Sequence, residues 1–197
     1  HTHLNVCAAA LEQPELLRET LTIIDELKTC RVAPETLFRA AKEGEDAALS
    51  CKLQELAVIY TAYDRLCADN LPDPRDRLTL LAARLPESGV LQGASVYIDC
   101  FASFTPQELE VIRVMVESGV DLTISVLSDL DEKEVFVSGC KTVARLRRMA
   151  MRRGIPCELT SFGEGKLEKP SDLAVLERQA LLPVTDAHPS DGHSVHI

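Results

Sequence analysis

The sequence contains no tryptophan and few other aromatic residues. Five phenylalanines and three tyrosines account for 4% of its 197 residues. Domains that bind single-stranded nucleic acids over a broad surface stack successive bases on several aromatic side chains. The composition therefore argues against a base-stacking module.

Basic residues are also fewer than acidic ones. Lysine and arginine number 21 against 31 acidic residues, which gives a formal net charge of −10. Such a surface repels phosphate backbones over most of its area. Any role with nucleic acid must therefore be local, or be shared with a more basic partner or neighbouring domain. The basic stretch at Arg145, Arg147, Arg148, Arg152 and Arg153 could touch phosphate, but we favour the solvated face of a helix.

The interior of the chain has no histidine, because all five lie in the terminal segments, at His1, His3, His188, His193 and His196. A Ser-His-Asp or Cys-His catalytic arrangement is therefore excluded from the interior, and we expect no metal site. The seven cysteines are odd in number, widely spaced and without a C-x-x-C pair. This pattern indicates neither a disulfide framework nor a zinc site.

Most cysteines stand in apolar segments, so we interpret them as small buried side chains in a reducing compartment, the cytoplasm. No apolar run approaches the length of a membrane span, and no signal peptide is visible. The chain begins with HTHLNVCAAA instead of methionine. We interpret it as a fragment of a longer protein or as a processed chain.

The first 88 residues have a helical pattern, and we expect them to form a helical subdomain. Apolar periodicity and helix-end signals predict helices over Pro14–Cys30, Ala33–Gly44, Glu45–Asn70 and Asp76–Leu85. Residues 89–165 change character and predict strands at Val96–Ile98, Asp121–Leu127 and Ile155–Phe162, with helices at Thr105–Ser118 and Thr142–Arg153 between them.

Strands that alternate with helices predict an α/β fold with a parallel sheet and crossover helices. We therefore expect a partial, three-stranded, parallel RecA-like sheet of the P-loop NTPase type after the helical subdomain. Residues 166–197 are predicted to hold a docking helix, DLAVLERQALL, and a loose tail that contains three of the histidines.

The stretch VYIDCFASFTPQELEVI, residues 96–112, ends a strand on Asp99 and opens a helix at Thr105. Thr105 can cap that helix, Pro106 suits its first position, and Glu108 completes a capping box. An aspartate at the end of an apolar strand is where P-loop enzymes hold magnesium. Asp99 is therefore interpreted as a vestigial residue of that second phosphate-site motif.

Two features argue against ATP hydrolysis by this chain alone. Helicases usually follow the magnesium aspartate with a glutamate that acts on the attacking water, but here Cys100 follows Asp99. The sequence also contains no G-x-x-x-x-G-K-[ST] phosphate loop. An active nucleotide hydrolase is thus disfavoured, and no catalytic residue is assigned.

Several segments resemble one family. YIDCFASFTPQE resembles the signature Y-I-D-G-F-x-x-F-T-P-Q-E of the AddB component of the bacterial AddAB helicase–nuclease. CKLQELAVIYTAYDRLC, DPRDRLTLLAARLPES and DLAVLERQALL resemble further motifs of that family, in the same order, from Cys51 to Leu182. The departure is Cys100, which stands where the family has glycine.

The resemblance implies an internal fragment of an inactivated helicase region, in a subunit that pairs with an AddA-type subunit and processes DNA. ATP, Mg and a 4Fe-4S cluster are cofactors of the family's whole protein, and none is expected in this fragment. The family resects double-strand breaks for recombinational repair until it meets the Chi sequence in the unwound strand. The fragment is expected to be a non-catalytic scaffold that contributes to recognition of that strand.

The loop Phe101–Gln107 is the candidate DNA-binding site. We hypothesise that Phe101 or Phe104 stacks on a base, while Thr105 and Gln107 form hydrogen bonds to base or phosphate. The alternative is that both phenylalanines fill the core beneath the loop. The alternative for the whole chain is an acidic α/β module that binds another protein and has no ligand or catalytic role.

Overall fold

The computed structural model describes residues 13–70, 73–128, 136–161 and 170–179. Its elements, in chain order, are α1 (Pro14–Thr29), α2 (Pro34–Glu43), α3 (Ala47–Asn70), the short 3-10 helix η1 (Pro74–Asp76), α4 (Arg77–Arg84), the 3-10 helix η2 (Leu85–Glu87), β1 (Ser95–Phe101), α5 (Pro106–Glu117), β2 (Asp121–Val126), α6 (Val137–Arg152) and α7 (Ser171–Gln179). The α/β class predicted from the sequence is confirmed, and helices predominate.

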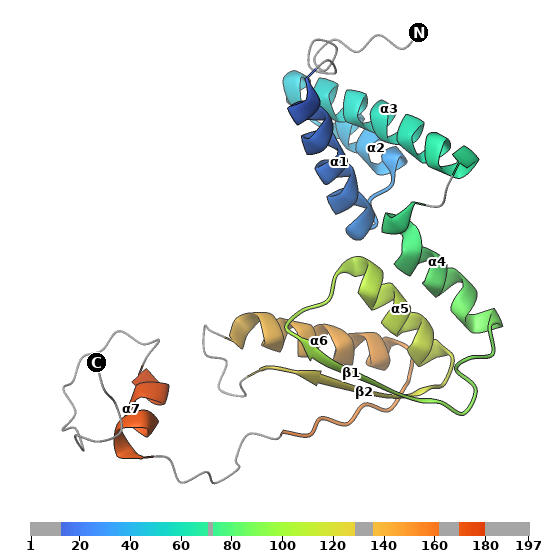
Figure 1. The fold of residues 1–197 in the computed structure, drawn as a ribbon. Coiled ribbons are helices and arrows are strands. Elements are labelled where there is room, and N and C mark those ends of the chain that lie inside the picture. Colours follow the sequence, from blue (N-terminus) through green and yellow to red (C-terminus); the bar gives the residue numbers. More distant parts are fainter. Residues whose placement is uncertain (1–12, 71–72, 129–135, 162–169, 180–197) are drawn as a thin grey trace.

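Helices α1, α2 and α3 pack together as a helical unit at one end of the molecule (Figure 1). Its core is built from Ile24, Leu37, Ala57 and Tyr60, and Ile24 retains 1% of its exposed surface. Pro34 stands at the start of α2 and Gly44 follows its end, as the sequence predicted. Helix α3 is only partly buried along its length, because its Leu49 and Leu66 are 53% and 63% exposed.

A buried lysine ties this helical unit to η1. The ammonium group of Lys28, on α1, lies 2.8 Å from Asp64 Oδ1, 3.1 Å from Asp73 Oδ2 and 2.7 Å from Asp76 Oδ2. Burial alone would lower the pKa of Lys28, but the hydrogen bonds that its ammonium group donates to the three aspartates outweigh it, and the pKa lies above its ordinary value. The cluster therefore holds α1, α3 and η1 at a fixed separation.

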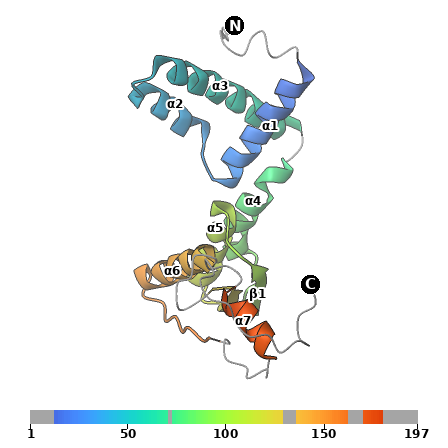
Figure 2. The same ribbon diagram turned by 90° about the vertical axis from the view of Figure 1, so that its left-hand side faces the viewer.

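A second core joins α4 to α5, and so connects the helical half to the α/β half (Figure 2). Ala82, Leu85, Val111 and Val114 form its buried centre. Beside it, the amide of Gln107 donates to the carbonyl oxygen of Arg75 at 2.9 Å and to the hydroxyl of Thr79 at 3.2 Å. These contacts fix the start of α5 against the helices that precede it.

The α/β half is a β-α-β unit. Strands β1 and β2 are parallel, with Ser95 opposite Asp121 and Ile98 opposite Ile124. Helix α5 makes the crossover between them, and α6 lies beside α5 on the same face of the sheet (Figure 1). Phe104, Leu109 and Ile112 form the core beneath the helices, together with partly buried side chains from both strands and α6. Alternate residues of each strand face this core, as the two-residue period requires.

The third strand expected at Ile155–Phe162 is not formed in the part of the chain that the structure describes. Residues 155–161 have no regular secondary structure, Phe162 lies outside the described residues, and the described strands form a two-stranded sheet. Pro156 has no N–H to donate, so it is a poor member of a strand ladder. The three-stranded RecA-like sheet therefore stays a prediction.

The structure corrects three smaller expectations. Helix α6 begins at Val137, five residues before the predicted start at Thr142. The cysteines are not small buried side chains, because Cys30, Cys100 and Cys157 are exposed and the other three described ones are half-buried. The predicted docking helix exists as α7, but its Leu173 and Leu176 are 40% and 51% exposed. The predicted tail and all five histidines lie outside the described residues.

Candidate functional site

The end of β1 contains a strained turn. Cys100 has a φ angle of +67°, in the left-handed region that residues with a Cβ rarely adopt. The register of the sheet shifts between Ile98 and Phe101 at this residue, which indicates a bulge. The family signature has glycine here, and the backbone explains why, because glycine reaches this conformation without a steric penalty. Asp99 and Phe101, on either side of Cys100, are both exposed.

Asp99 is exposed to solvent, on the face of the sheet away from α5 and α6. Its Oδ1 accepts hydrogen bonds from the Ser125 hydroxyl and from the Cys100 N–H, the latter at 2.8 Å. The hydrogen bond from Ser125, followed by that from Cys100, holds the pKa of Asp99 below its usual range. The carboxylate is therefore ionised at neutral pH and fixed in position.

Asp99 does not by itself form a nucleotide–magnesium site. Within the described residues, no three His, Cys, Asp or Glu side chains gather in a way that could hold a metal ion. The sequence also lacks the phosphate loop that would contribute the other half of the site. Because one surface carboxylate does not fit Mg and ATP, no catalytic step can be derived through them here.

Phe101 and Phe104 lie together in the loop after β1. Their ring centroids are 5.0 Å apart with an interplanar angle of 24°, an offset-stacked arrangement. Phe104 is 8% exposed and belongs to the core beneath α5 and α6, whereas Phe101 is 38% exposed. The inner ring therefore supports the outer one, and Phe101 offers the accessible aromatic face.

The remaining two candidate DNA contacts have structural partners. Thr105 Oγ1 accepts from the Glu108 N–H at 3.3 Å, and Glu108 Oε2 accepts from the Thr105 N–H at 2.7 Å, which confirms the predicted capping box. Gln107 is 5% exposed, and its side-chain amide donates hydrogen bonds to Arg75 and Thr79. The structure thus brings Phe101, Phe104 and Thr105 together at the sheet end, while Gln107 points into the junction with α4.

Other motif positions surround Lys28. The rings of Tyr60 and Tyr63 lie with their centroids 5.9 and 5.5 Å from its ammonium group, and Asp73 and Asp76 pair with it. The tyrosines come from the segment CKLQELAVIYTAYDRLC and the aspartates from DPRDRL. Two motifs that resemble the family therefore meet at a buried cation, which sequence analysis did not single out.

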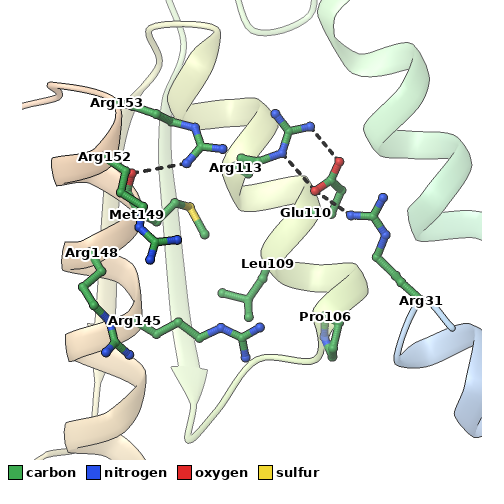
Figure 3. A pocket seen from close by; sticks show the side chains of 10 residues that line it. All are labelled: Arg31, Pro106, Leu109, Glu110, Arg113, Arg145, Arg148, Met149, Arg152 and Arg153. Atoms are coloured by element: carbon green, nitrogen blue, oxygen red, sulfur yellow. Dashed lines mark hydrogen bonds and ion pairs between the residues drawn. The ribbon is translucent and has the colours of Figure 1, made fainter. Parts of the chain in front are cut away.

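The basic stretch that we interpreted as a solvated face lines, with all of its arginines except Arg147, an open groove of about 590 Å3 between α5 and α6 (Figure 3). Glu110 stands among its six arginines, which are Arg31, Arg113, Arg145, Arg148, Arg152 and Arg153. Arg113 Nη2 lies 2.6 Å from Glu110 Oε1, and Arg31 Nη1 lies 2.6 Å from Glu110 Oε2. Hydrogen bonds from Arg113, and then from Arg31, lower the pKa of Glu110 to about 2. The spacing of the arginines along α6, at intervals of three and four positions, was the sequence signal that could have indicated this groove.

The geometry defines an α/β protein with a parallel β-α-β unit, an aspartate at the carboxyl end of its first strand and an attached helical unit. The family described as "ADDB, N-terminal" matches residues 1–177. The chain therefore belongs to the AddB N-terminal family. None of the described helices is long and apolar enough to cross a membrane.

Individual relatives carry the same assignment, because each is named as the B-type subunit of an ATP-dependent helicase/deoxyribonuclease. The chain is 35% identical over 161 residues to the protein of this name from Desulforudis audaxviator, 34% over 167 residues to that from Moorella thermoacetica, and 36% over 143 residues to that from Acetivibrio thermocellus. These alignments cover 77%, 79% and 70% of this chain, but 13%, 14% and 12% of the relatives. The chain thus spans a small part of the length of the proteins that it matches.

Proposed function

We propose that this chain is a non-catalytic part of a helicase–nuclease subunit that resects DNA ends in recombinational repair, and that it contacts the unwound single strand. Its membership of the AddB N-terminal family supports the proposed role in the processing of DNA ends. The full protein is then expected to pair with an AddA-type subunit in the cytoplasm and to use ATP, Mg and a 4Fe-4S cluster held outside this chain.

The observation that carries the DNA contact is the exposed ring of Phe101. It stands beside the carboxyl end of a parallel strand, where α/β proteins commonly bind ligands. Phe104 supports the ring from below, so it is already oriented before a base arrives. Stacking on a pre-oriented aromatic side chain is tolerant of sequence and contributes about 1–3 kcal/mol per base. Thr105 follows Phe104 in the chain and is the polar candidate for a base or phosphate.

The non-catalytic character follows from Asp99 and Cys100. Asp99 occupies the position of a magnesium aspartate, but the following residue cannot serve as the base that activates water. The loop Phe101–Gln107 beside them can still serve as a contact surface. Recognition of a regulatory sequence such as Chi would use this surface to hold the strand without consuming nucleotide.

The test is single-strand binding by the two-subunit complex with Phe101→Ala in this subunit. We expect the affinity for a labelled oligothymidylate to fall about fivefold or more, the lower end of one lost stacking contact. Tyr97→Ala is the matched control, because Tyr97 is an aromatic residue on the same strand and is 74% exposed. Equal losses in the two variants, or none in either, would contradict a specific contact at Phe101.

A further inference from the structure

The groove between α5 and α6 concentrates positive charge in a chain that is otherwise acidic. Six arginines and one glutamate line it, in a protein with a net charge of −10. The arginines come from three separate parts of the chain: Arg31 from the turn after α1, Arg113 from α5, and the others from α6 and the residue that follows it (Figure 3). Segments far apart in the sequence therefore converge on one positive groove.

Half of these arginines have no counter-charge in the described part of the chain. Arg113 and Arg153 pair with Glu117, and Arg31 pairs with Glu110. Arg145, Arg148 and Arg152 have neither an ion pair nor a side-chain hydrogen bond to any described residue. They are separated by three and four residues, so they share one face of α6, where like charges repel each other. An anion in the groove would offset that repulsion.

The shape of the groove suits an extended polyanion. Seven residues separate Arg145 from Arg152, which is about 10 Å along the helix. Three arginines spread over this distance can each contact a different phosphate of a single strand that runs along the helix. Leu109 and Met149 form an apolar floor, on which sugar rings can lie.

One end of the groove lies near the strand-end loop. Pro106 lines the groove and is the first residue of α5, five residues after Phe101. The positive end of the α5 dipole adds to the field of the arginines at this point. A strand with a base on Phe101 could therefore continue past Pro106 into the groove.

We propose that this groove binds the phosphodiester backbone of single-stranded DNA, with Arg145, Arg148 and Arg152 each contacting a phosphate. The guanidinium group presents paired donors that match phosphate oxygens, and it stays charged at all physiological pH values. The inference rests on the proposed role in DNA handling and adds a second, sequence-independent contact to it. Phe101 takes a base, and the groove holds the backbone.

The experiment measures binding of labelled oligothymidylate to the two-subunit complex as salt is raised from about 50 to 200 mM. Each single-strand phosphate contact contributes about 0.7 to the slope of log affinity against log salt. The triple substitution Arg145→Gln, Arg148→Gln and Arg152→Gln should therefore reduce the slope by about 2. It should also weaken binding at low salt by about tenfold or more.

The matched control removes the same charge elsewhere, through Arg39→Gln, Arg65→Gln and Arg147→Gln. These three arginines are exposed and lie outside the groove, and Arg147 is on α6 itself. The comparison is repeated with one charge removed, between the single variants Arg148→Gln in the groove and Arg147→Gln outside it. Thermal unfolding verifies that each variant is folded. A slope that falls equally in groove and control variants would overturn the proposal.

A further arm identifies the class of polyanion. If polyglutamate displaces oligothymidylate from the unsubstituted complex as well as unlabelled oligothymidylate does, the groove binds acidic protein segments and the assignment to DNA is wrong. The groove inference and the proposed function can also fail separately. If Phe101→Ala weakens binding while Arg148→Gln behaves as Arg147→Gln, the groove inference fails and the contact at Phe101 stands.

Discussion

The ring of Phe104 is buried beneath α5 and α6, and the ring of Phe101 stacks on it with the centroids 5.0 Å apart. The two side chains are three residues apart and yet have different surroundings, one in the core and one at the surface. Truncation should therefore separate a stability effect from a binding effect.

Phe104→Ala is expected to destabilise the protein by about 3 kcal/mol or more, because it opens a cavity beneath the sheet end. Phe101→Ala should cost about 1 kcal/mol or less, since its ring is already 38% exposed. Urea unfolding followed by circular dichroism gives both values. A larger loss for Phe101→Ala than for Phe104→Ala would show that the assignment of inner and outer ring is reversed.

Cys100→Gly should stabilise the protein. Cys100 has a φ angle of +67°, and left-handed backbone costs a residue with a Cβ about 1–2 kcal/mol. Glycine relieves that cost but loses more chain entropy on folding, so we expect a net gain of about 0.5–1 kcal/mol. Cys157→Gly is the control, because Cys157 is exposed and does not have a positive φ. The midpoint of urea unfolding should rise for the first and fall or stay constant for the second.

Lys28→Met should be strongly destabilising. It would leave Asp64, Asp73 and Asp76 facing one another without their cation, and the loss of one partner from a buried ionic cluster costs about 3–5 kcal/mol. Lys42→Met, at an exposed position on α2, should change the free energy of unfolding by less than about 0.5 kcal/mol. If the two variants were equally stable, the cluster at Lys28 would contribute nothing to the fold.

The local signals of this chain were predictable, while its long-range pairings were not. The capping box at Thr105 and the start of α2 at Pro34 follow from side-chain chemistry within a few residues. The parallel direction of the strands follows from their alternation with a helix. The partners of Lys28 and Gln107 lie between 28 and 48 residues away and come together only through packing. Periodicity alone does not identify such pairs. The third strand stays a prediction for a related reason. A short apolar run becomes a strand only where a neighbour pairs with it, and residues 155–161 have no regular secondary structure.

The candidate site shows the same division. The sequence pointed to the loop Phe101–Gln107, but it could not tell which phenylalanine is accessible, since both are equally apolar. It also contained the arginine spacing of α6, but it did not show that α5 and the turn after α1 add Arg113 and Arg31 to the same groove. A run of basic residues can be recognised within one segment of the sequence, whereas a groove forms only when several helices and turns pack together.

Gly139→Ala should destabilise the protein, although alanine normally stabilises a helix interior by about 1 kcal/mol relative to glycine. A Cβ at Gly139 would lie 1.9 Å from the carbonyl oxygen of Leu127, so α6 would have to move away from the end of β2. We expect a loss of about 2 kcal/mol or more, measured by thermal unfolding. Ser138→Ala, at the neighbouring position, should leave the unfolding temperature nearly unchanged. A gain in stability for Gly139→Ala would contradict the close approach of α6 to Leu127.

Glu110 should make the stability of the protein sensitive to acid. Its pKa is lowered to about 2 by Arg113 and Arg31, below the value of about 4.3 that it has in an unfolded chain. A carboxylate with a lower pKa in the folded state stabilises the fold above its unfolded pKa, and this contribution is lost as pH falls toward the folded value. Solvent screens the pair, so the contribution is on the order of 1 kcal/mol. Glu110→Gln should therefore reduce stability at pH 7 by about that amount, and the difference from the unsubstituted chain should shrink between about pH 4.5 and 2. Urea unfolding of both proteins across this range measures the difference, and a gap that stays constant down to the lowest pH would contradict the depressed pKa.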